Sequence, residues 1–322
     1  MVIGEQAEAG GSRAVARRGA TPLPLPAGLH ERVERVAADL LRPDGEPPVD
    51  FTEPYGEPAL TRPDSVSWQI FRNPVSLMIG GVAAVILELA EPRVRTAIWD
   101  QSSFRSDPLG RLKRTGLAAM ITVYGPHSNA ETMIAGIRRI HERVRGKAPD
   151  GRVYRASEPE LLGWVQATAS YGFLQAYHRY VRHLEPAQRD RAYAEAAVAA
   201  RLYGATEAPR SEAESEALFA RTASTLSASP IVFEFLDTVA RTPVLPRGLR
   251  AFQPLLIRAA VDLVPAPIRQ TLELGPQHGL AAWQRLTVRV AARTADRLLL
   301  RSHPAVQACR RLGLPDDYLL GR

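Results

Sequence analysis

The sequence predicts an all-α protein: a single large multi-helix globular domain preceded by a disordered N-terminal leader. Apolar residues recur at spacings of three and four along most of the 322 residues, which is typical of amphipathic helices. Alternating apolar and polar residues, the pattern of half-buried strands, are scarce. Hydrophobic residues make up 45% of the chain, enough for a large core, and no repeat period is visible. These observations favour one globule of about ten helices.

The N-terminal part of the chain contains both the leader and the most apolar segment. Residues 1–27 lack a long apolar run, so we expect a disordered leader there and the domain itself over 28–322. A helix is predicted over 32–41, followed by an extended Pro-rich connector over 42–63. A strongly apolar helix is predicted over 75–90. Its Gly80 and Gly81 allow another backbone or a flat ligand to come close.

Helix boundaries are marked clearly in the middle of the chain. Asp107 and Pro108 supply an N-cap and a first-turn proline for a helix that ends near residue 123. A second helix is predicted over 129–145, where Gly146 stops it. Residues 147–155 are predicted to form a polar turn.

The C-terminal half is predicted to be almost entirely helical. Ser157 and Glu160 form a capping-box pair that opens a long helix to about residue 184. The next helix covers 186–202 and stops at Gly204. After an acidic segment at 207–216, helical stretches are predicted at 214–227, 230–240, 250–263, 267–272 and 278–300.

The charge is strongly basic. A net charge of +7 and a pI near 9.9 point at first to nucleic acid or an anionic membrane surface. The arginines are spread over many predicted helices, however, and segments 105–115 and 131–155 carry +3 and +4, which equals the whole excess. We therefore expect no nucleic-acid partner, and a DNA-binding regulator is only a third hypothesis.

Cysteine content and hydropathy further limit the possible classes of protein. Cys309 is the only cysteine, which excludes intramolecular disulfides, thiolate zinc sites, iron–sulfur clusters and covalently attached haem. It is predicted to be a packing residue. The longest apolar run, 75–87, is shorter than the roughly 20 residues that a bilayer requires. We expect a cytoplasmic protein without a transmembrane segment, with a membrane-peripheral location as an alternative, and the oligomeric state is left open.

Several enzyme motifs are absent from the sequence. It contains no phosphate-binding loop, no strand-borne dinucleotide motif, no nucleophile elbow and no zincin motif. No histidine stands in the Glu-x-x-His spacing of di-iron bundles. These absences exclude the corresponding NTPases, hydrolases and zinc proteases, and they weigh against a ferritin-type di-iron bundle.

His141 is a candidate ligand. On a wheel of about 100° per residue, the side chains within about 60° of Ile137 are Met133, Ile134, Ile140, His141 and Val144. The imidazole therefore lies in an apolar stripe that faces the core, with Arg138 at its edge. The alternative is a core histidine hydrogen-bonded to a backbone carbonyl.

The preceding helix carries a polar face. Spacings of three, four and seven place on one side Arg111, Arg114, Thr115, Ala118 and Thr122. Two guanidinium groups, a hydroxyl group and small side chains suit the lining of a polar pocket. An ordinary solvated face is the alternative.

Several sequence runs occur together in a fixed order. SFRSDPLGRLKRT at 103–115 is followed by RRIHERVRG at 138–146, PDG at 149–151, YRA at 154–156 and EPELLGWVQAT at 158–168. This ordered set resembles the family of latex-clearing rubber oxygenases and the fungal endoplasmic-reticulum oxygenase of mycophenolic acid synthesis. The resemblance extends over roughly residues 73–315.

The resemblance implies a mostly helical domain that holds non-covalent haem b and cleaves carbon–carbon double bonds of isoprenoid chains with O₂. It places the axial iron ligand at His141, with Arg138 of the same element as a cofactor-binding residue. It also places Arg111 and Thr115 on the distal side, with Arg114 as a third candidate catalytic residue. The leading hypothesis is a haem b-dependent oxygenase that acts on an apolar, unsaturated small molecule.

The chain departs from the family pattern at three positions. Arg114 stands where the rubber oxygenases have lysine, Gln166 where many relatives have histidine, and Glu91 where they have the histidine of a His-Pro pair. Arginine stays charged and does not readily ligate iron, so the lysine-gated closed state of the rubber oxygenases does not carry over. These departures motivate an alternative hypothesis, a non-catalytic helical module that binds haem or another apolar ligand.

Overall fold

The fold is built almost entirely from helices. The computed structural model describes residues 22–24, 26–43, 45 and 47–320, so most of the predicted leader at 1–27 lies outside the described residues. The helices of the N-terminal half are α1 (Ala27–Leu40), α2 (Val66–Ile70), α3 (Pro74–Glu88), α4 (Pro92–Gln101), α5 (Pro108–Tyr124), α6 (His127–His141) and α7 (Pro159–Tyr180). Those that follow are α8 (Pro186–Tyr203), α9 (Glu212–Thr222), α10 (Pro230–Arg241), α11 (Gln253–Leu263), α12 (Ala266–Thr271), α13 (Ala282–Ala295) and α14 (Pro304–Arg311). The all-α prediction is confirmed.

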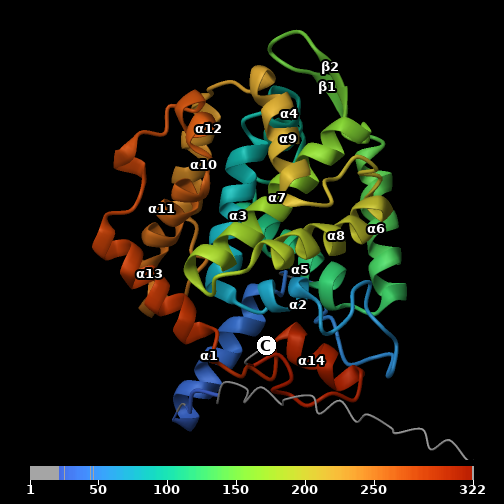
Figure 1. Cartoon of the computed structure of the whole chain (residues 1–322), viewed down its shortest axis with the longest axis vertical. Coiled ribbons are helices and arrows are strands. Elements are labelled where there is room, and N and C mark those ends of the chain that lie inside the picture. The colour runs from blue at the N-terminus through green and yellow to red at the C-terminus, as the bar shows by residue number, and fades with distance from the viewer. Residues whose placement is uncertain (1–21, 25, 44, 46, 321–322) are drawn as a thin grey trace, which may run out of the picture.

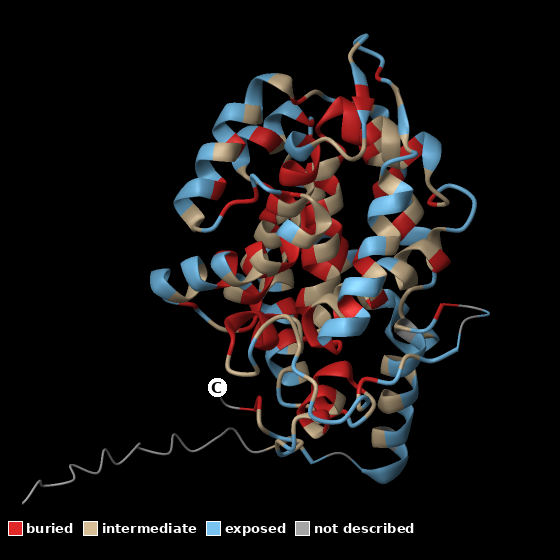
Figure 2. Ribbon diagram, turned by 90° about the vertical axis from the view of Figure 1, so that its right-hand side faces the viewer, coloured by how far each residue is buried: buried red, intermediate tan, exposed pale blue. Residues whose placement is uncertain are grey.

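The centre of the molecule is the pair α3 and α7. On one side of it lie α10 to α13, and on the other side lie α5, α6 and α8, as Figure 1 shows. Figure 2 shows that the buried residues gather on the central helices, whereas the outer helices present exposed faces. Since α3 is apolar over nearly its whole length, it is stable only with other helices packed around it.

Two glycines let α3 and α7 cross in backbone contact. A Cβ atom on Gly80 would lie 2.8 Å from the carbonyl oxygen of Gly172, and one on Gly172 would lie 2.4 Å from the carbonyl oxygen of Gly80. Both distances are shorter than van der Waals contact, and both neighbours are backbone atoms that cannot rotate away. The predicted close approach at Gly80 is confirmed.

Replacing Gly172 by alanine is expected to lower the free energy of unfolding by about 2–4 kcal/mol, because the two helices must move apart. Urea denaturation followed by circular dichroism measures this loss. Gly136→Ala on α6 is the matched control, since a Cβ there meets nothing within 4 Å. It should be neutral or stabilising by up to about 1 kcal/mol. Equal unfolding midpoints for the two variants would contradict the proposed backbone contact.

Local start and stop signals place several elements as predicted. Asp107 caps α5 through a hydrogen bond from the Gly110 N–H group, with Pro108 in its first turn. α8 ends at Gly204, which has a φ of +92°. Cys309 is buried in a second, smaller core shared by α2, α5 and α14, as expected of a packing residue.

Arg311 joins the chain end to distant segments. Its fully buried guanidinium donates to the carbonyl oxygens of Glu57 at 2.8 Å, Phe51 at 2.7 Å and Tyr124 at 2.7 Å. These acceptors belong to the Pro-rich connector and to the end of α5. One side chain of α14 thereby ties the connector to the end of α5.

Two local predictions are wrong. Residues 147–155 are not only a turn: β1 (Arg145–Lys147) and β2 (Val153–Arg155) pair in antiparallel fashion, and each strand is too short for a periodic signal. Tyr154 points inward from β2 and accepts a hydrogen bond from Gln101 at 2.7 Å. Ser157 and Glu160 form no capping box, because α7 begins at Pro159 with Glu158 as its N-cap residue. The Glu160 carboxylate accepts from Arg93 at 2.8 Å instead.

The sequence predicts no transmembrane segment, and the hydropathy of the helices bears on this prediction. Within the described ranges, no individual helix has the length and hydropathy needed to cross a bilayer. Among the described residues, the pair α3 and α4 reaches that length and composition when taken together, but the two helices are bent by 112° at their junction.

Candidate functional site

The N-terminal half of α5 presents Arg111 and Thr115 as one unit. An Nη atom of Arg111 donates to Thr115 Oγ1 at 2.9 Å, and Thr115 Oγ1 donates to the Arg111 carbonyl oxygen at 2.8 Å. The Asp107 cap and Pro108 fix the turn on which both residues stand. The prediction that these two side chains lie on the same face of the helix is therefore confirmed.

Arg114 points to the loop before α5. It donates to Ser103 Oγ at 2.9 Å and to Asp107 Oδ2 at 3.1 Å. The Asp107 carboxylate thus binds both the helix N-terminus and this guanidinium. Arg114 consequently holds the 102–107 loop against the first turns of α5.

His141 is the last residue of α6, four residues before the predicted helix end. Its Nδ1 atom is buried and has no hydrogen-bond partner among the described residues. Burial lowers the pKa of the imidazole, and the positive charge of Arg111 lowers it further. His141 is therefore a neutral imidazole with an unsatisfied polar atom, which is the form that ligates metals.

The apolar stripe around His141 is less continuous than predicted. Ile134 is buried, and Met133 and Ile137 are half-buried, but Ile140 is exposed. The helix ends at His141, so the wheel geometry no longer applies to Val144. The prediction that Ile140 faces the core is wrong, whereas the inward placement of His141 is confirmed.

Glu88 is a member of the site that the sequence reasoning missed. It is the last residue of α3, and its carboxylate has no hydrogen bond or ion pair with any described residue. Burial raises its pKa to about 8, opposed by the charge of Arg111. A single acidic residue at the end of an otherwise apolar helix was the available signal.

Arg111 interacts electrostatically with both Glu88 and His141. Its charge acts on the carboxylate of Glu88 and on the imidazole of His141, so residues from α3, α5 and α6 converge there. The cluster combines a carboxylic acid, a guanidinium, a hydroxyl and a neutral imidazole. Side chains of these types are able to polarise a small ligand and to exchange protons near neutral pH.

The pKa of Glu88 predicts a pH dependence of stability. Between pH 4.5 and pH 8 the unfolded chain has lost this proton while the folded chain keeps it, so the free energy of unfolding falls as pH rises. Glu88→Gln has no carboxyl group to titrate, so its free energy of unfolding does not fall in this way. We expect the variant's stability advantage to grow by about 1–3 kcal/mol from pH 5 to pH 8, measured by urea denaturation of cofactor-free protein. A constant advantage across that range would show that Glu88 titrates normally.

Arg138 lies apart from this cluster. It is exposed on α6, and a Cβ on Gly204 at the end of α8 would lie 4.0 Å from its Nε atom. No hydrogen bond or ion pair joins its side chain to another described residue. Its guanidinium is thus available to a ligand at the α6–α8 edge.

Two of the three departures from the family pattern have local explanations. Glu91 is buried as the N-cap of α4, where it accepts from the N–H groups of Arg93 and Val94. The side chains of Arg93, at 2.9 Å, and Arg152, at 3.4 Å, neutralise it. Gln166 donates to Ser170 Oγ at 3.2 Å on its own helix.

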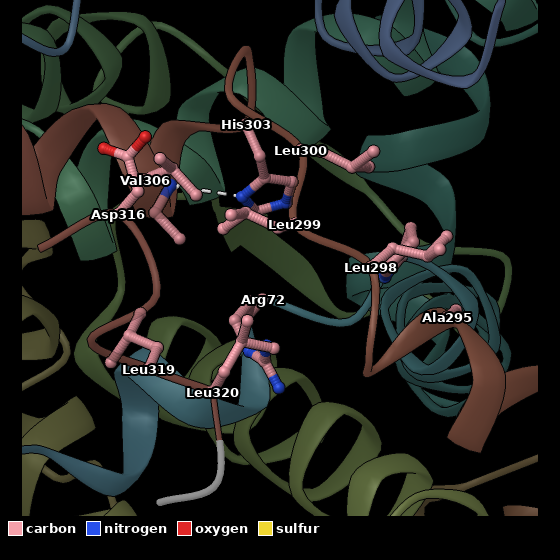
Figure 3. Close-up of a pocket in the computed structure, with 12 residues that line it drawn as sticks. Arg72, Ala295, Leu298, Leu299, Leu300, His303, Val306, Asp316, Leu319 and Leu320 are labelled. Carbon is pink, nitrogen blue, oxygen red and sulfur yellow. Dashed lines mark hydrogen bonds between the residues drawn. The ribbon is translucent and has the colours of Figure 1, made fainter. Parts of the chain in front are cut away.

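A small pocket near the C-terminus is distinct from this site. It measures about 20 Å³ and lies among Arg72, His303 and leucines 298–300, 319 and 320 (Figure 3). His303 Nδ1 accepts from the Ala305 N–H group at 3.1 Å as the cap of α14, and burial lowers its pKa to about 4. The pocket is therefore part of the packing around α14.

Comparison with known proteins gives one match. A family model described as "ER-bound oxygenase mpaB/B'/Rubber oxygenase, catalytic domain" matches residues 68–297, more than two thirds of the chain. Neither the curated proteins nor the solved structures include a match. Glu88, Arg111, Thr115, Arg138 and His141 all lie within the matched residues.

Proposed function

Because the chain belongs to the family of mpaB and rubber-oxygenase catalytic domains, we propose that it is a haem b-dependent oxygenase with His141 as the axial iron ligand. Its substrates in this proposal are O₂ and an apolar, unsaturated, isoprenoid-like small molecule. The observation that carries the proposal is the neutral imidazole of His141, whose buried Nδ1 atom has no partner among the described residues.

The donor set suits haem better than an iron ion held by side chains alone. The described part of the chain contains no group of three or more His, Cys, Asp or Glu residues that could hold a metal ion. A porphyrin supplies four iron ligands itself, so one imidazole is sufficient. When bound, haem supplies an iron centre that activates O₂ for cleavage of a carbon–carbon double bond.

Arg111 stabilises negative charge on oxygen. Thr115 accepts a hydrogen bond from the Arg111 guanidinium and holds it in one orientation before substrate binds, so little reorganisation of the charged group is needed. Arg114 supports them in this proposal, because its bonds to Ser103 and Asp107 hold the first turns of α5 in place. It acts as a charged positioning residue.

Glu88 supplies the proton chemistry. With a pKa near 8 its carboxyl group is largely protonated at neutral pH, and it can give or take a proton without a large energetic penalty. Arg111 stabilises the carboxylate form. Arg138, exposed one turn before His141, is assigned to a haem propionate, for which a guanidinium is a good partner.

Haem reconstitution tests this function directly. The purified full-length protein should show a Soret band after haem b is added and should consume O₂ when an isoprenoid alkene is supplied. A protein that takes up no haem would overturn the proposal. A haem-loaded protein that is inert towards O₂ and alkenes would establish the non-catalytic binding module instead.

A further inference from the structure

The outward face of α13 is unusually apolar. Trp283, Leu286 and Val290 are 67%, 63% and 57% exposed, although the opposite face of the same helix is buried through Val288 and Ala292. Figure 1 shows α13 at the outer edge of the molecule. The helix therefore carries apolar side chains on a face that contacts no described residue of the core.

These three residues form a stripe and are not scattered. Spacings of three and four place them within about 60° of one another on the helix. The other large apolar side chains that are this exposed within the described ranges are Tyr55, Ile140, Val153 and Leu249, each on a different segment. Single exposed apolar residues are ordinary, whereas a contiguous row marks an interaction surface.

The charges beside the stripe are all positive. α13 contains three arginines and no acidic residue. Arg289 and Arg293 are exposed, and their Nε atoms donate to the carbonyl oxygens of Arg179 and Val181, both at 3.3 Å. Those bonds hold the two arginines along one flank of the stripe, where both residues are exposed.

We propose that α13 docks the protein onto an anionic phospholipid bilayer, with Trp283, Leu286 and Val290 inserted at the headgroup–acyl boundary and Arg289 and Arg293 on the lipid phosphates. An apolar face with tryptophan beside arginines is the pattern of helices that lie in a membrane interface. A second copy of the chain is a poorer occupant, because two such faces would bring like charges together. The inference does not depend on haem binding.

Tryptophan fluorescence gives a specific test with the full-length protein. Trp68, Trp99 and Trp164 are buried, so Trp283 is the only exposed one of the four tryptophans. Vesicles of phosphatidylcholine with about 30% phosphatidylglycerol should bind the protein, and brominated lipid should quench its emission. Trp283→Phe should abolish the quenching but preserve cosedimentation. Pure phosphatidylcholine, or about 0.5 M NaCl, should weaken binding at least tenfold.

Paired variants separate the apolar and the electrostatic contributions. The double variant Leu286→Gln/Val290→Thr should lose at least tenfold in vesicle affinity, and Arg289→Gln/Arg293→Gln should lose the preference for anionic lipid. Val153→Thr, at a 73% exposed site on β2, is the control and should bind as the unaltered protein does. Thermal melts verify that each variant is folded.

Two results would overturn the proposal. One is an unaltered protein that does not bind phosphatidylglycerol vesicles at low salt. The other is a dimer in light scattering that Leu286→Gln converts to a monomer without any change in vesicle binding, which would make this face a contact between copies.

Discussion

Replacing His141 by alanine is expected to abolish the Soret band of the haem-reconstituted protein. The reason is that the proposed iron ligand is the neutral imidazole at the end of α6, and alanine offers no donor atom in its place. Absorption spectroscopy after removal of unbound haem measures the loss. Added imidazole should restore the band, because a free ligand fills the space that the side chain leaves.

The matched control lies at the other end of the same helix. His127 is half-exposed and lies 3.3 Å from Glu131 on the surface, so His127→Ala should keep the full Soret band. If His141→Ala retains an unaltered band, iron is bound elsewhere and the assignment fails. A band that imidazole does not restore in a correctly folded variant would indicate a packing role.

Replacing Arg111 by methionine is expected to lower the turnover of an isoprenoid alkene by about 10²–10³-fold while haem remains bound. Methionine removes both the charge that acts on Glu88 and His141 and the donor to Thr115. The pKa of Glu88 should then rise further, so the pH profile of kcat should shift to higher pH. Rates of O₂ uptake from pH 6 to pH 9 measure both effects.

Two further variants make this result specific. Arg111→Lys keeps the charge without the planar guanidinium, so it should recover part of the rate but not all of it. Thr115→Val should lose less than Arg111→Met, since the charge stays in place. Full turnover in Arg111→Met would exclude a role in oxygen chemistry, and loss of the Soret band would assign Arg111 to haem retention instead.

The parts of the structure that follow from local rules could be predicted from the sequence. The cap at Asp107, the stop at Gly204 and the close approach at Gly80 each depend on a few neighbouring residues. The pairing of Arg111 with Thr115 depends only on helical spacing. The inward placement of His141 followed in the same way.

The missed features depend on contacts between distant segments. Glu88 belongs to the site only because α3 and α5 bring it near Arg111, and no periodicity reports such an approach. Glu160 had a good capping-box spacing, yet Arg93 from another helix offered its carboxylate a charged partner. The helix also begins two residues after Ser157, so the local pair does not form.

The three hydrogen bonds of Arg311 define how much chain is needed for an independently folding fragment. The family-matched segment, 68–297, excludes Arg311 together with two of its acceptors, Phe51 and Glu57. It also excludes Ala305, Ala308 and Cys309, which fill the smaller core beside α5. A fragment cut at the family boundaries would expose that core and leave the Tyr124 carbonyl unsatisfied. A stable fragment is therefore longer than the family-matched segment, and expression should begin before Phe51 and continue through Leu319.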